Sequence, residues 1–152
     1  MIIKNFKVSK YFWFNEIVST SYLEFAESNI EESIKFLHDA TDFARYILDE
    51  CREYLGPFSP GSWFRGVELN YKVGGSTNSA HMRGLAVDYT RWSAWDKLQE
   101  AGRGLYAHLT SKGNAVKIIM ESKDGAYWLH IGAAENSSLW TGINGVYKKQ
   151  KP

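Results

Sequence analysis

The fold is decided by residues 116–130, which read VKIIMESKDGAYWLH. Two runs rich in β-branched and aromatic residues flank Asp124-Gly125, a strong signal for a two-residue hairpin turn. This turn predicts two antiparallel strands in which Glu121 lies opposite Trp128. Because side chains alternate along a strand, His130 then shares a face with Glu121, roughly 7–8 Å away as a diagonal neighbour. A slip of one residue in the register would separate the two side chains.

Outward from the hairpin, residues 79–88 read SAHMRGLAVD. Gly84 suits a bend, and the residues that follow it predict a strand whose apolar side chains share one side. Asp88 then points to the opposite side. A buried carboxylate on such a strand is unfavourable unless it is paired or bound to a cation, and His81 is a suitable partner because it comes from the bend.

The first third of the chain is expected to be helical. Asn29 is a good N-cap residue, and Glu32 stands three positions later, where it can reach back to the cap. Apolar residues recur at three- and four-residue steps as far as Leu55, and Gly56-Pro57 supplies the stop. We therefore expect one helix of about seven turns, preceded over residues 1–28 by an extended segment and short helices.

The rest of the chain is expected to contain both strands and a helix, which makes the predicted fold α+β. A helix capped by Ser93 is expected over residues 93–110, and residues 147–152 are expected to be a frayed, solvated end. The expected strands lie near residues 62–65, 85–90, 116–121 and 127–131. Together these elements predict a single domain over residues 1–152, with a small, mainly antiparallel sheet packed against helices.

Composition limits the classes of function. The chain has 152 residues, of which 44% are hydrophobic, and its 18 Lys and Arg balance 17 Asp and Glu to a net charge of +1. Such a balance argues against nucleic acid as a partner. Because Cys51 is the single cysteine, an internal disulfide and a Cys-based zinc cluster are excluded. Cys51 lies on the apolar stripe of the expected helix, which predicts a buried thiol. No signal peptide or membrane-inserting segment is expected, so synthesis in the cytoplasm is predicted.

A family resemblance adds to this pattern. Ser79, His81, Gly84, Ala86 and Asp88, spaced as Ser-x-His-x-x-Gly-x-Ala-x-Asp, are followed by Trp128-x-His130. This combination resembles the M15 peptidases, which are zinc D-Ala-D-Ala carboxypeptidases and peptidoglycan endopeptidases that share the hedgehog/DD-peptidase fold. Upstream residues are similar to the family's Ser-Gly-Tyr-Arg…Asn…Val-Gly-Gly stretch, namely Ser62-Trp63-Phe64-Arg65, Asn70 and Val73-Gly74-Gly75. The resemblance covers residues 62–132 and implies that they form the metal-site core of the domain.

The resemblance implies roles for individual residues. It implies that His81, Asp88 and His130 bind Zn²⁺, and that Arg65 contacts substrate or stabilises developing negative charge. Glu121 is expected to be the general base, with Asp124 as the alternative, because Tyr127 stands where some members carry the catalytic glutamate. Ser79 and Trp128 are expected to contact the substrate. Ser79 and Tyr89 are also candidates for orienting the metal ligands. The candidates for lining a substrate groove are Trp92, Trp95 and Trp140. Trp63 replaces the family's usual glycine and is expected to reshape the floor beside Arg65.

These roles imply a zinc peptidase acting on peptidoglycan stem or cross-bridge peptides, expected to be a monomer. Without a signal peptide, it would act at the cell wall after release by a lysis partner, as an endolysin does, or as part of a phage virion. A non-catalytic relative that keeps the fold as a zinc-binding or virion structural domain is the main alternative. A non-haem iron oxygenase also uses two histidines and a carboxylate, but that class usually places its first histidine and carboxylate much closer together.

Overall fold

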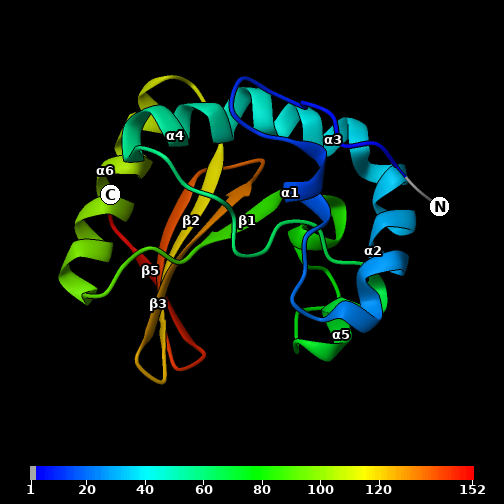
Figure 1. Cartoon of the computed structure of the whole chain (residues 1–152). Helices are drawn as coiled ribbons and strands as arrows, with labels where there is room; N and C mark the ends of the chain where they lie inside the picture. Colours follow the sequence, from blue (N-terminus) through cyan, green and yellow to red (C-terminus); the bar gives the residue numbers. More distant parts are fainter. Residues whose placement is uncertain (1–2) are drawn as a thin grey trace.

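The computed structural model describes residues 3–152, and its centre is one sheet of five strands (Figure 1). The strand order is β1-β3-β2-β4-β5, and every neighbouring pair is antiparallel except β2 with β4, which is parallel. The strands are β1 (Ala86–Tyr89), β2 (Val116–Lys123), β3 (Ala126–Ala133), β4 (Ser138–Ile143) and β5 (Val146–Gln150). The fold is a single α+β domain consistent with the hedgehog/DD-peptidase architecture.

The predicted hairpin register is confirmed. Glu121 pairs with Trp128, and Ile119 pairs with His130. The turn between β2 and β3 uses Asp124 and Gly125 with φ values of 50° and 82°, which is the left-handed geometry that a tight hairpin requires. Glu121 and His130 therefore lie on one face of the sheet, as the turn predicts.

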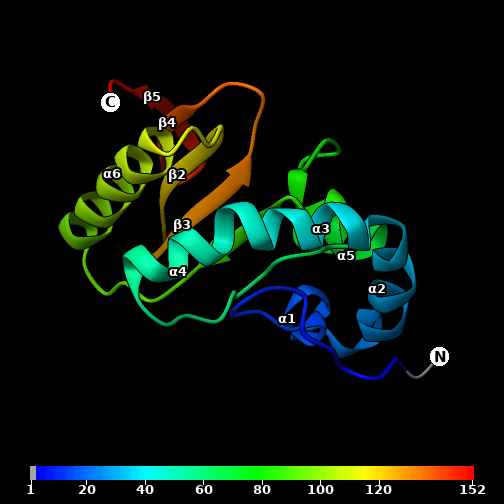
Figure 2. The same cartoon turned by 90° about the horizontal axis from the view of Figure 1, so that it is seen from above.

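The helical first third differs from the prediction of one long helix. The helices are α1 (Phe14–Val18), α2 (Ala26–Ser33), α3 (Leu37–Phe43), α4 (Asp49–Leu55), α5 (Val67–Lys72) and α6 (Trp95–Ser111). A π turn, Ala44–Leu48, joins α3 to α4, so these two form one rod, whereas α2 runs in another direction (Figure 2). The change occurs at Phe36, whose φ of −110° and ψ of 6° leave the helical region. The prediction of Asn29 as an N-cap was wrong, because Asn29 lies inside α2.

Three other expectations are corrected. Residues 62–65 form no strand, because Ser62 makes only an isolated bridge with Asp88 before the chain turns Trp63 and Phe64 into the core. The expected frayed end contains β5, which pairs with β4 across an Asn144-Gly145 turn. The helix expected over residues 93–110 is present, but its N-cap is Ala94 rather than Ser93.

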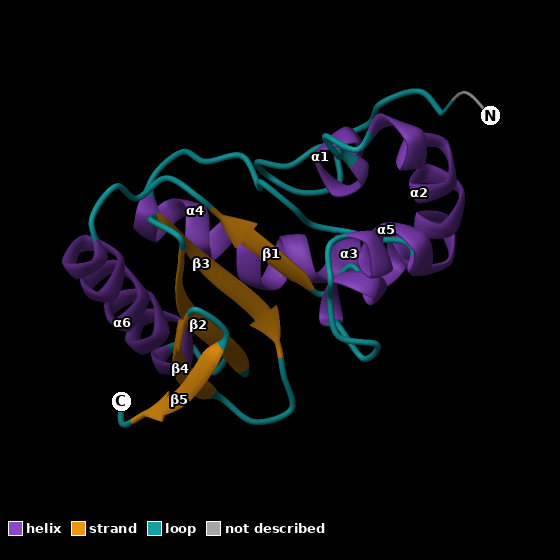
Figure 3. Cartoon of the chain, turned by 90° about the horizontal axis from the view of Figure 1, so that it is seen from below, coloured by secondary structure: helices purple, strands orange, loops and turns teal. Residues whose placement is uncertain are grey.

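The two faces of the sheet have different surroundings. Helix α6 packs on β2 and β3, and α4 packs against α6 and passes behind β1 and β3 in Figure 3. The apolar face carries fully buried side chains from three strands, among them Val87, Ile118, Met120 and Leu129, and they pack with Leu98, Leu105 and Leu109 of α6. Alternation along the strands places Asp88, His130 and Glu121 on the other face. The apolar face of the sheet therefore packs into the core, and the polar candidate residues lie on the opposite face.

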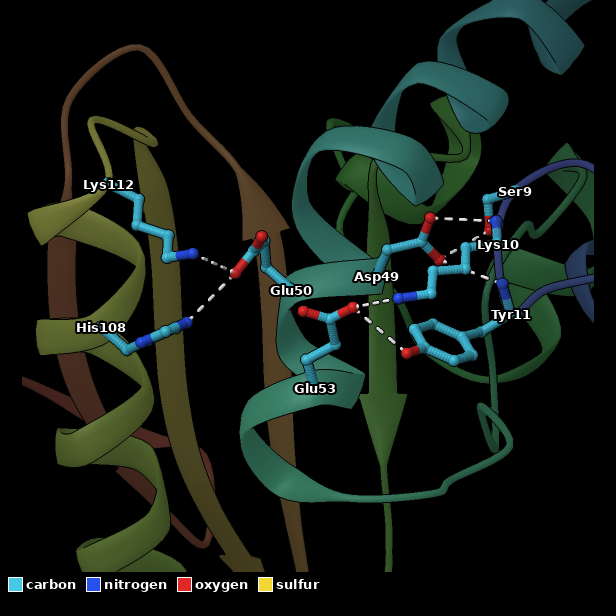
Figure 4. Close-up of polar contacts among 8 residues, drawn as sticks. All are labelled: Ser9, Lys10, Tyr11, Asp49, Glu50, Glu53, His108 and Lys112. Carbon is cyan, nitrogen blue, oxygen red and sulfur yellow. Dashed lines mark hydrogen bonds and ion pairs between the residues drawn. The ribbon is translucent and has the colours of Figure 1, made fainter.

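Helix α4 joins the N-terminal segment to α6 through acidic side chains (Figure 4). Asp49 accepts hydrogen bonds from the Ser9 hydroxyl and from the backbone N–H groups of Lys10 and Tyr11, at 2.8, 3.0 and 3.3 Å. On the side of α6, Glu50 lies 3.0 Å from the Lys112 Nζ and 3.2 Å from the His108 Nε2. Glu53 contacts Lys10 and Tyr11 as well. These contacts attach residues that precede the first helix to the centre of the molecule.

Cys51 is completely buried in the core, as its place on the apolar stripe predicts. Burial raises the pKa of its thiol far above the ordinary value, so the group stays protonated and inert. Among residues 3–152, no helix is both long enough and apolar enough to cross a membrane.

Candidate metal centre and active site

Three of the predicted site residues converge where β1 meets β3. Asp88 of β1 lies directly opposite His130 of β3, and the His130 Nδ1 is 3.2 Å from the Asp88 Oδ1. His81 comes from a 3₁₀ turn, Ala80–Arg83, that precedes β1, and its Nε2 is 3.3 Å from the Asp88 Oδ2. One ligand atom from each side chain lies within 4.8 Å of the others. The structure therefore brings together residues that are up to 49 positions apart in the chain.

Backbone groups fix the orientation of the His81 ring. Its Nδ1 lies 2.8 Å from the carbonyl oxygen of Trp63, and since a carbonyl only accepts, Nδ1 must carry the proton. The Ser79 hydroxyl accepts a hydrogen bond from the His81 N–H at 3.3 Å, and Arg65 N donates to the His81 carbonyl at 3.0 Å. Ser79 therefore acts on the backbone of the turn that presents His81.

The environment of the other ring nitrogen of His81 indicates a binding site for a cation. The His81 Nε2 is buried and has no hydrogen-bond partner among the described residues, although it faces Asp88. Burial lowers the pKa of His81 more than the neighbouring Asp88 raises it, so the neutral ring with a free lone pair is favoured. Burial raises the pKa of Asp88, but His81 and His130 together lower it by more, so the net pKa is lowered and the carboxylate stays charged. A lone pair and a carboxylate face each other favourably only with a positive charge between them.

The Asp88 carboxylate presents a different oxygen to each histidine. Its Oδ1 lies 3.2 Å from the His130 Nδ1, and its Oδ2 lies 3.3 Å from the His81 Nε2. Imidazole nitrogens and carboxylate oxygens are donors that zinc sites in proteins commonly use. Two imidazoles and one carboxylate leave a fourth position free, which is the pattern of a catalytic rather than a structural site.

Arg65 is held near these residues by the buried Asn29. The Asn29 amide donates to the carbonyl oxygens of Val18 and Phe64 and accepts from Gly66 N, at 2.9, 3.2 and 2.7 Å. These bonds fix the backbone on both sides of Arg65. Burial lowers the pKa of the guanidinium, while Asp88 and Glu121 raise it, so both carboxylates act on Arg65. The Arg65 Nε is buried with no hydrogen-bond partner among the described residues.

Glu121 accepts one hydrogen bond on each carboxylate oxygen. The Trp128 indole Nε1 donates to Oε2 and the Tyr147 hydroxyl donates to Oε1, both at 2.9 Å. Burial raises the pKa of Glu121, and the two donors together with His130 only partly offset that rise. Trp128, which was expected at the substrate, thus binds Glu121. Sequence reasoning missed Tyr147, although the Asn144-Gly145 turn signal could have revealed its strand.

Some predicted residues lie elsewhere. The Tyr89 ring is buried against Phe58 on the apolar face, so Tyr89 does not orient the ligands. The Trp63 ring is fully buried against Phe12 and Phe43. Asp124 stays exposed in the hairpin turn. Of the three candidate groove tryptophans, Trp92 packs on Tyr89 and Trp95 on Tyr127, whereas Trp140 pairs with Ile119 and so shares the face of His130.

A profile of the family described as Peptidase M15 matches residues 19–119 of this chain. The match covers well over half of the sequence and contains Arg65, His81 and Asp88, which confirms the resemblance inferred from the motifs. The chain belongs to the M15 peptidase family. Among curated proteins, none matches it significantly. The family assignment identifies a peptidase fold and activity class, and the matched range ends shortly before Glu121 and His130.

Proposed function

We propose that this protein is a zinc-dependent peptidase that hydrolyses peptide bonds in peptidoglycan stem or cross-bridge peptides, as an endolysin-like endopeptidase or a carboxypeptidase. The observation that carries the proposal is the unpaired, buried His81 Nε2 that faces the Asp88 carboxylate, whose other oxygen contacts His130. Membership of the M15 peptidases supports hydrolysis of a peptide bond. The motif resemblance supports the metal and the substrate class.

The donor set suggests how the reaction would proceed. Zinc held by His81, Asp88 and His130 would act as a Lewis acid and lower the pKa of a water to about 7. Glu121 accepts the proton of the attacking water and passes it to the amine that leaves. Its raised pKa suits that role, because a stronger base takes the proton more readily near neutral pH.

Arg65 is the group placed to stabilise the negative charge that develops on the scissile carbonyl oxygen. Its guanidinium is desolvated, which strengthens its interaction with an oxyanion relative to the same interaction in water. Trp63 and Ser79 keep His81 in the orientation that presents Nε2, a role that partners of metal ligands commonly have. In this proposal the monomer reaches the cell wall after release during lysis, or on a virion.

Metal analysis and a cleavage assay on purified protein test this function. We expect one zinc per chain, hydrolysis of muropeptides that a chelator abolishes and zinc restores, and products whose masses identify the bond cut. Glu121→Gln should keep zinc but lower kcat by about 10²–10⁴-fold, the usual contribution of a general base. His81→Ala should lose zinc as well as activity. The exposed His38 offers a matched control, because its imidazole contacts Asp42 and belongs to no part of the candidate site.

Three other results would overturn the proposal. Bound zinc with no cleavage of any muropeptide would favour a non-catalytic binding or virion structural domain. Iron as the native metal, together with consumption of oxygen, would favour an oxygenase. Cleavage that neither a chelator nor His81→Ala affects would place the catalytic machinery elsewhere in the chain.

A further inference from the structure

One row of paired residues crosses four strands at Glu121. Trp128 of β3 pairs with Glu121, Glu121 pairs with Gly142 of β4, and Gly142 pairs with Tyr147 of β5. Paired residues share a face, so all four positions lie on the face that carries Asp88 and His130. Trp128 and Tyr147 therefore approach the carboxylate from its two sides.

Gly142 allows Tyr147 to reach across an intervening strand. A Cβ atom at Gly142 would lie 2.7 Å from the Tyr147 Cε1 and 3.3 Å from the Glu121 Cγ. The missing side chain thus leaves the space through which the phenol ring extends over β4 to donate to the Glu121 Oε1. Any larger residue at position 142 would have to displace the ring.

We propose that Tyr147 is a positioning residue which, with Trp128, holds the Glu121 carboxylate in the orientation needed for proton transfer. This inference rests on the proposed function. Each carboxylate oxygen has about two acceptor sites, so one donor on each leaves a second site free to take a proton from water. A glutamate side chain rotates about several bonds, and two fixed donors remove most of that freedom before substrate arrives.

The chemical nature of the two donors suits a base. A neutral phenol and a neutral indole orient the carboxylate without the full positive charge that Lys or Arg would bring, and such a charge would lower its basicity strongly. Besides Tyr147, the charged or titratable groups that act on Glu121 are Arg65 of the loop before α5, Asp88 of β1, and His130 of β3. Tyr147 is the group contributed by β5.

Tyr147→Phe tests this role, because it removes the hydroxyl and keeps the ring. We expect kcat to fall about tenfold at neutral pH, the loss of about 1.4 kcal/mol of transition-state stabilisation, with KM within about twofold of the wild-type value. The hydrogen bond from Tyr147 lowers the pKa of Glu121, so its removal should move the acidic limb of the kcat profile to higher pH. Zinc content should stay unchanged.

Three further variants make the test specific. Tyr147→Phe on a Glu121→Gln background should cause no additional loss, because Tyr147 acts through Glu121. Gly142→Ala should lower kcat in the same direction by displacing the ring while both hydrogen-bonding groups remain. Tyr46→Phe is the matched control, since Tyr46 is 68% exposed and its hydroxyl makes no hydrogen bond with the described residues. Circular dichroism and thermal unfolding establish that each variant folds.

A readout independent of activity is the titration of Tyr147 followed by NMR of ¹³C-labelled tyrosine. The phenol pKa is raised to about 12 by burial and by the Glu121 carboxylate. Tyr147 should therefore ionise at a lower pH in Glu121→Gln than in the wild type, with Tyr147→Phe providing the assignment. An identical titration in both proteins would show that the two groups do not interact, and would overturn the inference.

The outcomes separate this inference from the proposed function. If the wild type cleaves muropeptides but Tyr147→Phe has kcat and a pH profile within error of the wild type, only the positioning role is overturned. An additive loss on the Glu121→Gln background would also overturn it. If the wild type binds zinc and cleaves nothing, the proposed function fails, and the role of Tyr147 in positioning a catalytic base fails with it, even where the NMR titration demonstrates the hydrogen bond.

Discussion

Trp63 stands at a position where the sequence resemblance leads one to expect glycine, and its indole lies in the core. The ring is fully buried, contacts Phe12 and Phe43 edge-on, and donates from Nε1 to the Gly84 carbonyl at 2.8 Å. The main-chain carbonyl of the same residue binds the His81 Nδ1. One residue thus connects the core, the bend before β1 and a candidate metal ligand.

Trp63→Phe is expected to lower the free energy of unfolding by about 2–4 kcal/mol. The loss combines a cavity where the indole was with a buried Gly84 carbonyl left without its donor. Zinc binding below the melting temperature should persist, because the bond to His81 comes from the backbone. Urea unfolding and zinc titration measure the two effects, and Trp92→Phe, at a partly exposed tryptophan, should cost less. A loss below about 1 kcal/mol for Trp63→Phe would contradict the prediction.

At the scale of elements, two glycines determine how α6 packs. A Cβ at Gly102 would lie 2.6 Å from the Met120 Cγ and 3.1 Å from the Leu129 Cδ1, both inside the core beneath the helix. The atoms nearest to a Cβ at Gly104 would belong to the hydroxyl end of Tyr54, a side chain that is 46% exposed. Both glycines lower the intrinsic helix propensity of α6, but only Gly102 is required for close packing of α6 on the sheet.

Alanine substitutions at these two glycines should therefore have opposite signs or very different sizes. Gly102→Ala should destabilise the protein by about 1–3 kcal/mol, because overpacking against Met120 outweighs the gain of about 1 kcal/mol in helix propensity. Gly104→Ala should be neutral or slightly stabilising, since the Tyr54 side chain can move into solvent. Thermal and urea unfolding of both variants compare them directly. Equal effects would show that α6 has more room than its contacts with β2 indicate.

At the scale of the whole molecule, α4 connects the N-terminal segment to α6 (Figure 4). Hydrogen bonds from Lys112, which has the larger effect, and from His108 lower the pKa of Glu50 from its ordinary value near 4.5. A carboxylate with a lowered folded-state pKa stabilises the fold above its unfolded pKa, and that stabilisation is lost as the pH falls through the folded value. The side chain is 28% exposed, so solvent screening keeps the effect small.

Glu50→Gln should lower the free energy of unfolding at pH 7 by no more than about 1 kcal/mol. The difference between variant and wild type should shrink as the pH falls through the lowered folded-state pKa of Glu50, because the carboxylate is then protonated in the folded and the unfolded state alike. Urea unfolding over a series of acidic pH values measures it. Glu100→Gln, at an exposed helical pair with Lys97, is the matched control and should leave stability unchanged. A difference that does not change with pH would mean that packing, rather than charge, accounts for it.

The sequence by itself determined the features that depend on neighbouring residues. Asp124-Gly125 sets the turn geometry, and the alternation on either side of it sets the register that places Glu121 and His130 on one face. The motif spacing identified His81 and Asp88 as candidate ligands, which the structure brings together with His130. Such information is local, because turn dihedral angles and side-chain periodicity are properties of a few consecutive residues.

Only the tertiary structure decided which distant groups satisfy each polar atom. Asn29 has the sequence features of a helix cap, yet its amide binds the backbone of two distant segments inside the core. The helix breaks at Phe36, whose ring packs on Phe64, although the surrounding residues are compatible with a continuous helix. Tyr147 reaches Glu121 only because Gly142 lies between them in a neighbouring strand. These contacts join residues far apart in the chain, so no local pattern contains them.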